Sequence, residues 1–143
     1  MSQQVLIVVT GRDNVPSCLF RDRLWPRLKQ RLMNSTNLLL VEIELEKIRD
    51  IYSESFAKLY PPNLPRYIHW FPSFILCTHS SWVLREALNV EVFGGRIDHN
   101  EETGQEELSI GTSVALTEDN ICQWINKILV SKKFTNCGII YQL

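Results

Sequence analysis

A run of five apolar residues near the start of the chain constrains the fold more than any other feature. The run reads VLIVV over residues 5–9, and four of its five residues are β-branched. Continuous runs of this kind are typical of a strand that is buried on both faces, and the following Thr10-Gly11 would end it. Because such a strand lies inside a sheet that helices cover, we expect an α/β fold.

The next two segments predict a helix and a second strand. Over residues 18–32 the apolar side chains are spaced four apart and basic side chains occupy the other faces, as in an amphipathic helix: Phe20, Leu24, Leu28 and Leu32. Pro26 removes a backbone donor and clashes with the preceding turn, so the helix should kink there or begin late. Residues 38–45, LLLVEIEL, predict a strand that a right-handed crossover would make parallel to the first.

Residues 46–60 predict a second helix, which Pro61-Pro62 ends. Its apolar side chains fall on one stripe: Ile48, Ile51, Tyr52, Phe56 and Leu59. Residues 73–78, SFILCT, then predict a strand that Phe71-Pro72 leads in. A helix and a strand in this order continue the α/β pattern.

The last third of the chain predicts a further strand and a further helix. Residues 90–93 predict a short strand, and residues 80–89 before it are long enough for about two helical turns, which could cover an edge strand or mediate a dimer. Residues 98–111 are polar and acidic and predict a mobile surface loop. Residues 117–133 predict a helix that Thr117 caps, with an apolar stripe of Ile121, Trp124, Ile125 and Ile128 or Leu129. The whole is a mixed sheet of about four or five strands flanked by helices.

Composition excludes several classes of protein. With 143 residues and 45% hydrophobic residues, the chain can bury a core as one domain over residues 1–143 without disulfides or metal ions. Fifteen Lys and Arg stand against sixteen Asp and Glu, so neither nucleic acid nor a membrane is expected as a partner. No segment approaches the roughly 18–20 apolar residues of a membrane span, and the first residues lack the pattern of a signal peptide. We therefore expect a soluble, intracellular protein of the cytoplasm.

The four cysteines show no CxxC pair and no zinc spacing, so no metal site is expected. Cys77 lies inside a predicted strand and Cys122 lies next to a predicted buried stripe, which indicates core thiols. Cys137 lies in a tail that is expected to be exposed. Cys18 stands at a helix start, where a thiol is easily activated.

Three stretches resemble one family. They are VLIVV with Cys18 and the helix containing Pro26, the run Trp70-Phe71-Pro72-Ser73-Phe74-Ile75-Leu76, and Val92-Phe93-Gly94-Gly95-Arg96 followed by Glu118-Asp119, Ile121, Trp124, Ile125 and Lys127. In this order they resemble the thioredoxin-like superfamily, and more particularly the domains of protein disulfide isomerases. The resemblance implies a thioredoxin-like fold in which Pro72 is cis and faces the redox motif. Compact proteins of this kind also resemble some found in the particles of large DNA viruses, which would place the chain in a virion if its source is viral.

The sequence departs from the family at the redox motif, because a dithiol enzyme needs two thiols about one helical turn apart. If Cys18 holds the second position, the motif is Val15-Pro16-Ser17-Cys18 and valine replaces the attacking thiol. If Pro26 marks the family's kink, Cys18 holds the first position and the motif is Cys18-Leu19-Phe20-Arg21. Both alignments stay open, and neither allows a self-contained dithiol cycle.

Two functions are compatible with this motif. The first is a redox-inactive module that binds a protein or peptide, or has a structural role, and needs no cofactor. Its groove would lie beside Pro72, with backbone groups that pair with an extended peptide. The resemblance places Phe71, Ser73 and Trp70 at this groove, and Trp25 is a candidate for its apolar rim.

The alternative function is a monothiol oxidoreductase similar to glutaredoxins. The Cys18 thiolate would form a mixed disulfide with glutathione or with a protein thiol. Arg12 and Arg21 would stabilise the thiolate and bind the carboxylates of glutathione. A homodimer is compatible with either function.

Overall fold

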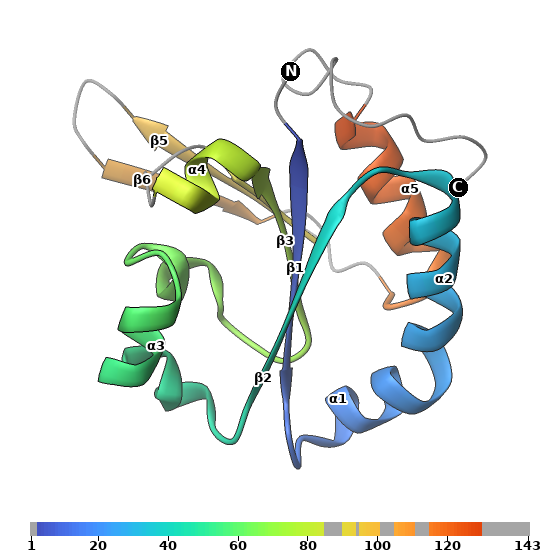
Figure 1. The fold of residues 1–143 in the computed structure, drawn as a ribbon, viewed down its shortest axis with the longest axis horizontal. Coiled ribbons are helices and arrows are strands. Elements are labelled where there is room, and N and C mark those ends of the chain that lie inside the picture. The colour runs from blue at the N-terminus through green and yellow to red at the C-terminus, as the bar shows by residue number, and fades with distance from the viewer. Residues whose placement is uncertain (1–2, 85–89, 94, 101–104, 111–114, 130–143) are drawn as a thin grey trace.

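The computed structural model describes residues 3–84, 90–93, 95–100, 105–110 and 115–129 (Figure 1). Six strands form one mixed sheet in the order β2-β1-β3-β4-β5-β6. They are β1 (Gln4–Gly11), β2 (Leu39–Leu45), β3 (Ser73–Thr78), β4 (Val90–Val92), β5 (Gly95–Asn100) and β6 (Gln105–Ile110). The predicted α/β class with helices flanking a mixed sheet is confirmed.

Strand β1 lies inside the sheet, as its apolar run predicts. It pairs in parallel with β2, with Val5 opposite Leu39, and antiparallel with β3, with Val9 opposite Ser73. All eight of its residues are buried. The predicted parallel crossover between the first two strands is confirmed.

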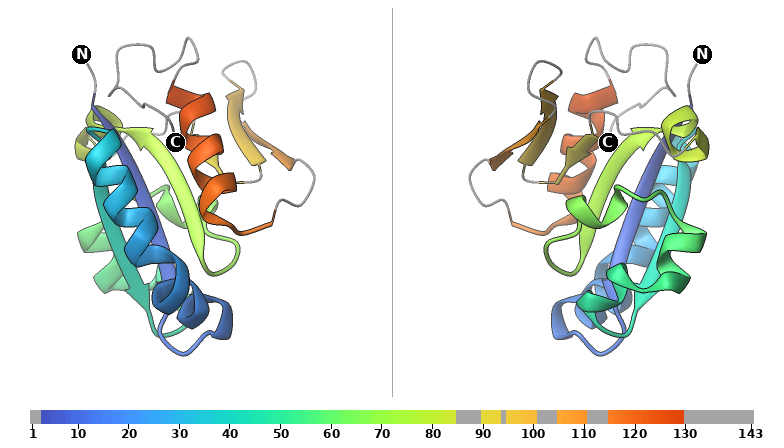
Figure 2. Two further views of the ribbon diagram at one scale, coloured as in Figure 1. Left: turned by 90° about the vertical axis from the view of Figure 1, so that its right-hand side faces the viewer. Right: turned by 90° about the vertical axis from the view of Figure 1, so that its left-hand side faces the viewer.

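One face of the sheet is covered by two longer helices, α2 (Trp25–Ser35) and α5 (Glu118–Leu129), which lie side by side (Figure 2). Leu28 and Leu32 of α2 and Ile121 and Ile125 of α5 are fully buried. They pack with Leu6 and Val8 of β1 and with residues of β3 in one core. We call this side the α2 face.

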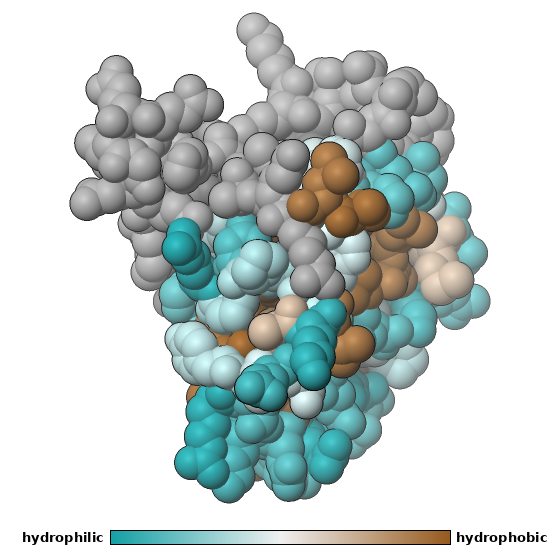
Figure 3. Space-filling view, turned by 60° about the vertical axis from the view of Figure 1, so that its left-hand side comes forward, coloured by the Kyte–Doolittle hydropathy of each residue, from teal (hydrophilic) through white to brown (hydrophobic). Residues whose placement is uncertain are grey.

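The helical pieces that the structure describes on the opposite face are all short, and we call it the α3 face (Figure 2). They are the 3-10 turns η2 (Ile48–Tyr52) and η3 (Leu64–Tyr67) and the helices α3 (Glu54–Leu59) and α4 (His79–Leu84). Their buried side chains pack on Val5, Ile7 and Val9, the residues of β1 that alternate with those of the α2 face. Figure 3 shows that apolar residues also reach the surface on this side, among polar ones.

The helical run after β1 is interrupted before Pro26, as predicted. It consists of α1 (Val15–Leu19), a π-helical turn η1 (Phe20–Leu24) and α2, and it changes direction between α1 and α2 (Figure 1). The backbone N–H of Trp25 donates to the carbonyl of Phe20, five residues back. Because Pro26 has no N–H and its ring crowds the preceding turn, the chain widens that turn instead of continuing a regular helix.

The prediction of one continuous helix over residues 46–60 is wrong, because two separate helical pieces form there. The chain forms η2 and α3 with a break at Ser53, whose hydroxyl accepts from the backbone N–H of Phe56 and so caps α3. Because of this break, the side chains of the predicted stripe do not share one buried face. Ile51 and Phe56 are buried, whereas Ile48, Tyr52 and Leu59 are exposed. A capping residue in mid-segment outweighed the helical spacing.

The predicted loop over residues 98–111 is also wrong, because β5 and β6 occupy most of it and form an antiparallel hairpin at the sheet edge. The sheet therefore has six strands instead of four or five. Strand β5 also pairs with β4, which gives backbone N–H and C=O groups of the hairpin their hydrogen-bond partners. This pairing does not depend on alternating apolar residues, so the sequence pattern does not indicate the hairpin.

Three remaining predictions are confirmed where the structure describes them. Strand β3 has the predicted bounds, and α4 provides a helix in the first part of the segment 80–89, of which residues 85–89 lie outside the described part. Helix α5 begins where Thr117 caps it, with the Thr117 hydroxyl accepting from Asn120 N at 3.1 Å. No helix among the described residues is long and apolar enough to cross a membrane.

Candidate functional site

A capped turn links the end of β1 to the start of α1. Asn14 Oδ1 accepts hydrogen bonds from the backbone N and the hydroxyl of Ser17, both at 3.0 Å. The fully buried Ser17 hydroxyl in turn accepts from the backbone N of Gly11 at 2.9 Å. This network sets the helix to begin at Val15, so that Cys18 lies at its fourth residue.

The Cys18 side chain is half-buried and lies against Arg21. Arg21 Nη2 is 3.3 Å from Cys18 Sγ, and the thiol donates to the carbonyl of Arg12 at 3.5 Å. The Arg21 guanidinium also donates to the carbonyls of Gly11 and Arg12, both at 2.8 Å. Arg21 therefore clamps the end of β1 to the helix while it contacts the thiol.

Arg12 contributes its backbone to the thiol and its side chain to the surface. Its side chain is 57% exposed, and its Nε is 3.8 Å from Glu44 Oε2. The same carboxylate lies 3.4 Å from Arg21 Nη1. Of the two predicted arginines, the structure thus brings Arg21 to the sulfur, and Arg12 is the one with an accessible guanidinium.

Residues 70–73 lie at the same end of β1. The Phe71–Pro72 peptide bond is cis and Pro72 is buried. A Cβ atom on Gly11 would be 2.5 Å from Phe71 Cδ2, so the ring of Phe71 packs directly on the Gly11 backbone and a larger residue there would displace it. The structure therefore brings the Pro72 segment and the turn before Cys18 to the same end of the sheet, where β1 ends and β3 begins.

Two of the predicted groove residues differ in exposure. Ser73 is buried and its hydroxyl donates to the carbonyl of Trp70, so it holds the loop in place. Trp70 is 46% exposed. The backbone N–H and C=O of the half-buried Phe71 bond to no other described residue.

The interpretation of Trp25 as a rim residue is wrong. Trp25 is 7% exposed and its ring lies 5.5 Å from that of Phe20 in the core of the α2 face. Its Nε1 donates to Glu42 Oε1 at 2.6 Å. Trp25 lies three residues before Leu28 and seven before Leu32, so it belongs to the buried face of α2.

Two other cysteines are core thiols, as predicted. Cys77 and Cys122 are both buried. Burial raises the pKa of the Cys77 thiol to about 12, although the Ser81 hydroxyl partly opposes this. Burial also raises the pKa of the Cys122 thiol to about 11, against the effect of nearby Arg31. Cys137 lies outside the described residues, and no cluster among the described residues could hold a metal ion.

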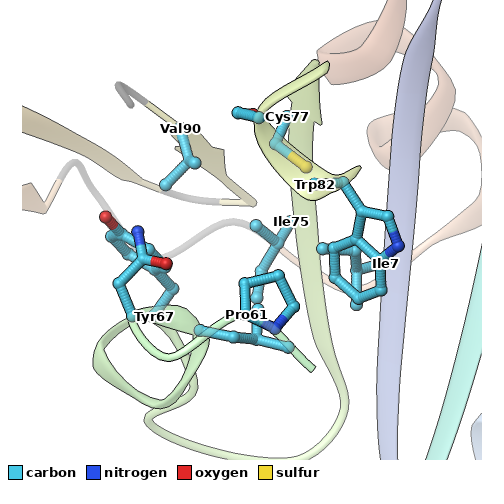
Figure 4. Close-up of a pocket in the computed structure, with 10 residues that line it drawn as sticks. Ile7, Pro61, Tyr67, Ile75, Cys77, Trp82 and Val90 are labelled. Atoms are coloured by element: carbon cyan, nitrogen blue, oxygen red, sulfur yellow. The ribbon is translucent and has the colours of Figure 1, made fainter. Parts of the chain in front are cut away.

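Among the described residues, each face of the sheet carries a pocket. Figure 4 shows the pocket of the α3 face, where Pro61 and Tyr67 face Trp82 and Cys77 above a floor that includes Ile75. The pocket of the α2 face is lined by Val8, Thr10, Phe20, Arg21, Trp25, Glu42, Ile43 and Glu44. Sequence reasoning missed Thr10, Glu42 and Glu44 as site residues. The signal for Glu42 and Glu44 is that they are two acids in the otherwise apolar run LLLVEIEL.

Comparison with known proteins identifies no relative. No protein-family model matches the chain, and neither a curated protein nor a solved structure matches it.

Proposed function

We propose that the chain is a thioredoxin-like binding module that holds an extended peptide against residues 70–73 and has no self-contained dithiol cycle. The order of elements supports this proposal. A first strand is followed by a kinked helical run with a cysteine in its first turns, then by a strand, a short helix, a Pro-led strand, a further strand and a last helix. The resemblance depends on the same order, to which the β5–β6 hairpin is an addition.

The backbone of Phe71 carries the proposal. Its N–H and C=O are unpaired among the described residues, and it lies two residues before β3, beside the end of β1. Half-buried polar backbone groups normally have partners, and an extended peptide can supply both a donor and an acceptor. The exposed Trp70 ring beside them offers the flat apolar contact that is common at binding hot spots.

The position of Val15 supports the absence of dithiol chemistry. Val15 is the first residue of α1 and is 68% exposed, whereas Cys18 lies three residues further on and is half-buried. This placement favours the alignment Val15-Pro16-Ser17-Cys18. In that alignment the accessible position carries a side chain that cannot form a mixed disulfide.

The proposal can be tested by titrating the full, ¹⁵N-labelled chain with carboxymethylated insulin B chain, an extended polypeptide without free thiols. We expect saturable NMR shifts at the amides of Phe71 and Ser73 and at the Trp70 indole. Trp70→Ala should weaken binding roughly fivefold or more, since truncated aromatic anchors commonly cost more than about 1 kcal/mol.

Tyr52→Ala is the matched control, because Tyr52 is a still more exposed aromatic residue on the α3 face. It should leave the affinity unchanged. Shifts that avoid residues 70–73, or equal weakening by both substitutions, would contradict the proposal.

One contact favours a second candidate function, a monothiol oxidoreductase. The Arg21 guanidinium lies 3.3 Å from the Cys18 sulfur, where it would stabilise a thiolate. The thiolate would attack one sulfur of glutathione disulfide, forming a Cys18–glutathione disulfide and releasing the other glutathione as a thiolate. Arg12, the accessible arginine, would bind a glutathione carboxylate.

The rate at which iodoacetamide alkylates Cys18 at pH 7 separates the two functions. The oxidoreductase requires a rate well above that of free glutathione, and Arg21→Gln should lower it. Cys18→Ser identifies the signal that comes from this thiol. A rate at or below that of glutathione, unaffected by Arg21→Gln, leaves the binding module as the function.

A further inference from the structure

The pocket of the α2 face has room for a side chain, unlike the apolar pocket of the α3 face. Its volume is about 180 Å³, against about 20 Å³ for the pocket in Figure 4. One water molecule needs roughly 10–15 Å³ by this measure, so the apolar pocket admits little more than a water. We call the larger one the Thr10 pocket, after the residue at its floor.

The widened turn η1 forms the roof of the Thr10 pocket. Phe20, Arg21 and Trp25, which begin and follow this turn, all line it. π-Helical turns are rare, and they occur frequently at functional sites because they displace side chains from their regular places. Here the turn leaves open space above β1 and β2.

Thr10 supplies an unused polar group at the floor. The residue is 6% exposed, and it follows Leu6 and Val8 in the alternation of β1, so its side chain points to the α2 face. Its hydroxyl makes no hydrogen bond to any residue that the structure describes. The hydroxyl does not belong to the buried polar atoms that lack a partner, so it is open to the pocket and can bond to a ligand there.

Acidic and basic side chains at the rim of the Thr10 pocket pair with one another, so that their charges largely cancel. Glu42 accepts from Trp25 Nε1 at 2.6 Å and from Lys29 Nζ at 2.7 Å, which uses both of its oxygens. Glu44 has only the longer approaches of Arg21 at 3.4 Å and Arg12 at 3.8 Å. Glu44 therefore keeps acceptor capacity, while the site as a whole has no excess negative charge.

This arrangement selects a neutral group that both donates and accepts. An ammonium group would meet Arg21, and a carboxylate would meet Glu44. A carboxamide can donate its N–H to Glu44 and accept from the Thr10 hydroxyl. The apolar rings of Phe20 and Trp25 would cover the aliphatic part of the same side chain.

The pocket lies at an open edge of the sheet. Strand β2 is the last in the sheet order, so its outer edge pairs with no other described strand. Ile43 packs its side chain into the core of the α3 face, so its backbone is what reaches the Thr10 pocket. An open edge can accept an extended peptide as an added strand, with side-chain pockets providing selectivity.

We infer that the β2 edge binds an extended peptide segment as an added strand, with a Gln or Asn side chain of that segment inserted into the Thr10 pocket. This surface is distinct from residues 70–73, and the inference does not depend on the proposed function. Main-chain pairing along β2 provides the affinity. The contacts to Thr10 and Glu44 provide the preference for a carboxamide.

The test uses the full chain and blocked pentapeptides of sequence Thr-Val-Xaa-Val-Thr, with Gln, Leu, Lys or Glu at the central position. We expect the Gln peptide to shift the amides of Thr10, Glu42 and Glu44 in ¹⁵N NMR spectra. It should bind roughly fivefold more tightly than the Leu peptide, as one net hydrogen bond allows. Replacing both Val residues of the peptide by Pro should abolish binding, because proline cannot donate to the ladder.

Thr10→Val removes the hydroxyl while keeping the shape of the side chain, so the variant should fold with unchanged or higher stability. It should bind the Gln peptide as weakly as the Leu peptide, and Trp70→Ala should have no effect. Tighter binding of the Lys or Glu peptide, no loss in Thr10→Val, or shifts confined to residues 70–73 would overturn the inference. A dimer that forms through β2 without peptide would also overturn it, by assigning the edge to a second copy of the chain.

Discussion

The two faces of the sheet are built differently although they share the same central strand. On the α2 face, two helices of 11 and 12 residues bury complete stripes, including Leu28, Leu32, Ile121 and Ile125. On the α3 face, helices of six residues and 3-10 turns each bury one or two side chains, and α3, α4 and η2 also leave apolar side chains exposed. Continuous stripes therefore hold the α2 face, and caps and turns hold the α3 face.

This difference places two of the three candidate sites on the better-anchored side, whereas Phe71 packs against the core of the α3 face. The Cys18 turn and the Thr10 pocket both lie where the helical run joins β1, and Arg21 belongs to both. A site needs side chains held in fixed positions, and long packed helices hold them better than short capped pieces.

The largest expected effect compares two leucines. Leu28→Ala, at a fully buried position of α2, should lower the free energy of unfolding by about 2–5 kcal/mol because it leaves a cavity in the core. Leu59→Ala, at a position of α3 that is 68% exposed, should change it by less than about 0.5 kcal/mol. Urea denaturation of both variants measures the difference, and similar losses would refute the contrast between the faces.

The next comparison sets two serines that organise helix starts against each other. Ser17→Ala should cost about 1–3 kcal/mol, since it leaves the buried N–H of Gly11 without its hydroxyl partner. Ser53→Ala, which removes the cap of the exposed helix α3, should cost about 1 kcal/mol. Thermal unfolding of the two variants under identical conditions ranks them, and a larger loss for Ser53→Ala would reverse the argument.

A smaller effect concerns the contact between α2 and α5. Arg31 Nη1 lies 3.1 Å from both Glu118 Oε1 and Asp119 Oδ1, and these acids also begin α5, where the helix dipole favours negative charge. Because the pairs are only partly buried, we expect a coupling free energy of about 0.5–1 kcal/mol between Arg31→Gln and Glu118→Gln. A double-mutant cycle in low salt measures it; zero coupling would show that packing alone joins the two helices.

The smallest effect is a pH dependence on the α2 face. Burial acts to raise the pKa of Glu42, but the hydrogen bonds from Lys29 and Trp25 outweigh it and lower the pKa below its ordinary value of 4.5. A lowered folded pKa gives stability that is present above about pH 4.5 and is lost as the pH falls through the folded pKa. Urea midpoints at pH 7 and pH 3 should therefore differ more for the wild type than for Glu42→Gln, and equal differences would contradict this role of Glu42.

The sequence predicted the α2 face better than the α3 face, for a physical reason. Apolar spacing alone specifies a long amphipathic helix such as α5, and the β-branched run specifies β1. The break at Ser53 depends on one cap competing with helical spacing, and the β5–β6 hairpin depends on backbone pairing, which leaves little trace in side-chain pattern. The spacing of apolar residues therefore predicts neither the break at Ser53 nor the β5–β6 hairpin.

The candidate site was predictable in part. Cys18, Arg21 and the Phe71-Pro72 segment follow from local patterns and from the resemblance. The Thr10 pocket does not, because it arises from the widened turn before Pro26 and from the way Phe20 and Trp25 lie over β1 and β2. Both depend on how the helix crosses the sheet, which only the tertiary structure gives.

Amide hydrogen exchange at Phe71 tests the central claim most directly. The account predicts that the Phe71 N–H exchanges rapidly in the free chain, because it has no described partner, and that carboxymethylated insulin B chain slows it while the amides of η2 stay unchanged. An N–H that is already protected in the free chain, or that the peptide leaves unprotected at saturation, would contradict the claim that this backbone binds an extended peptide.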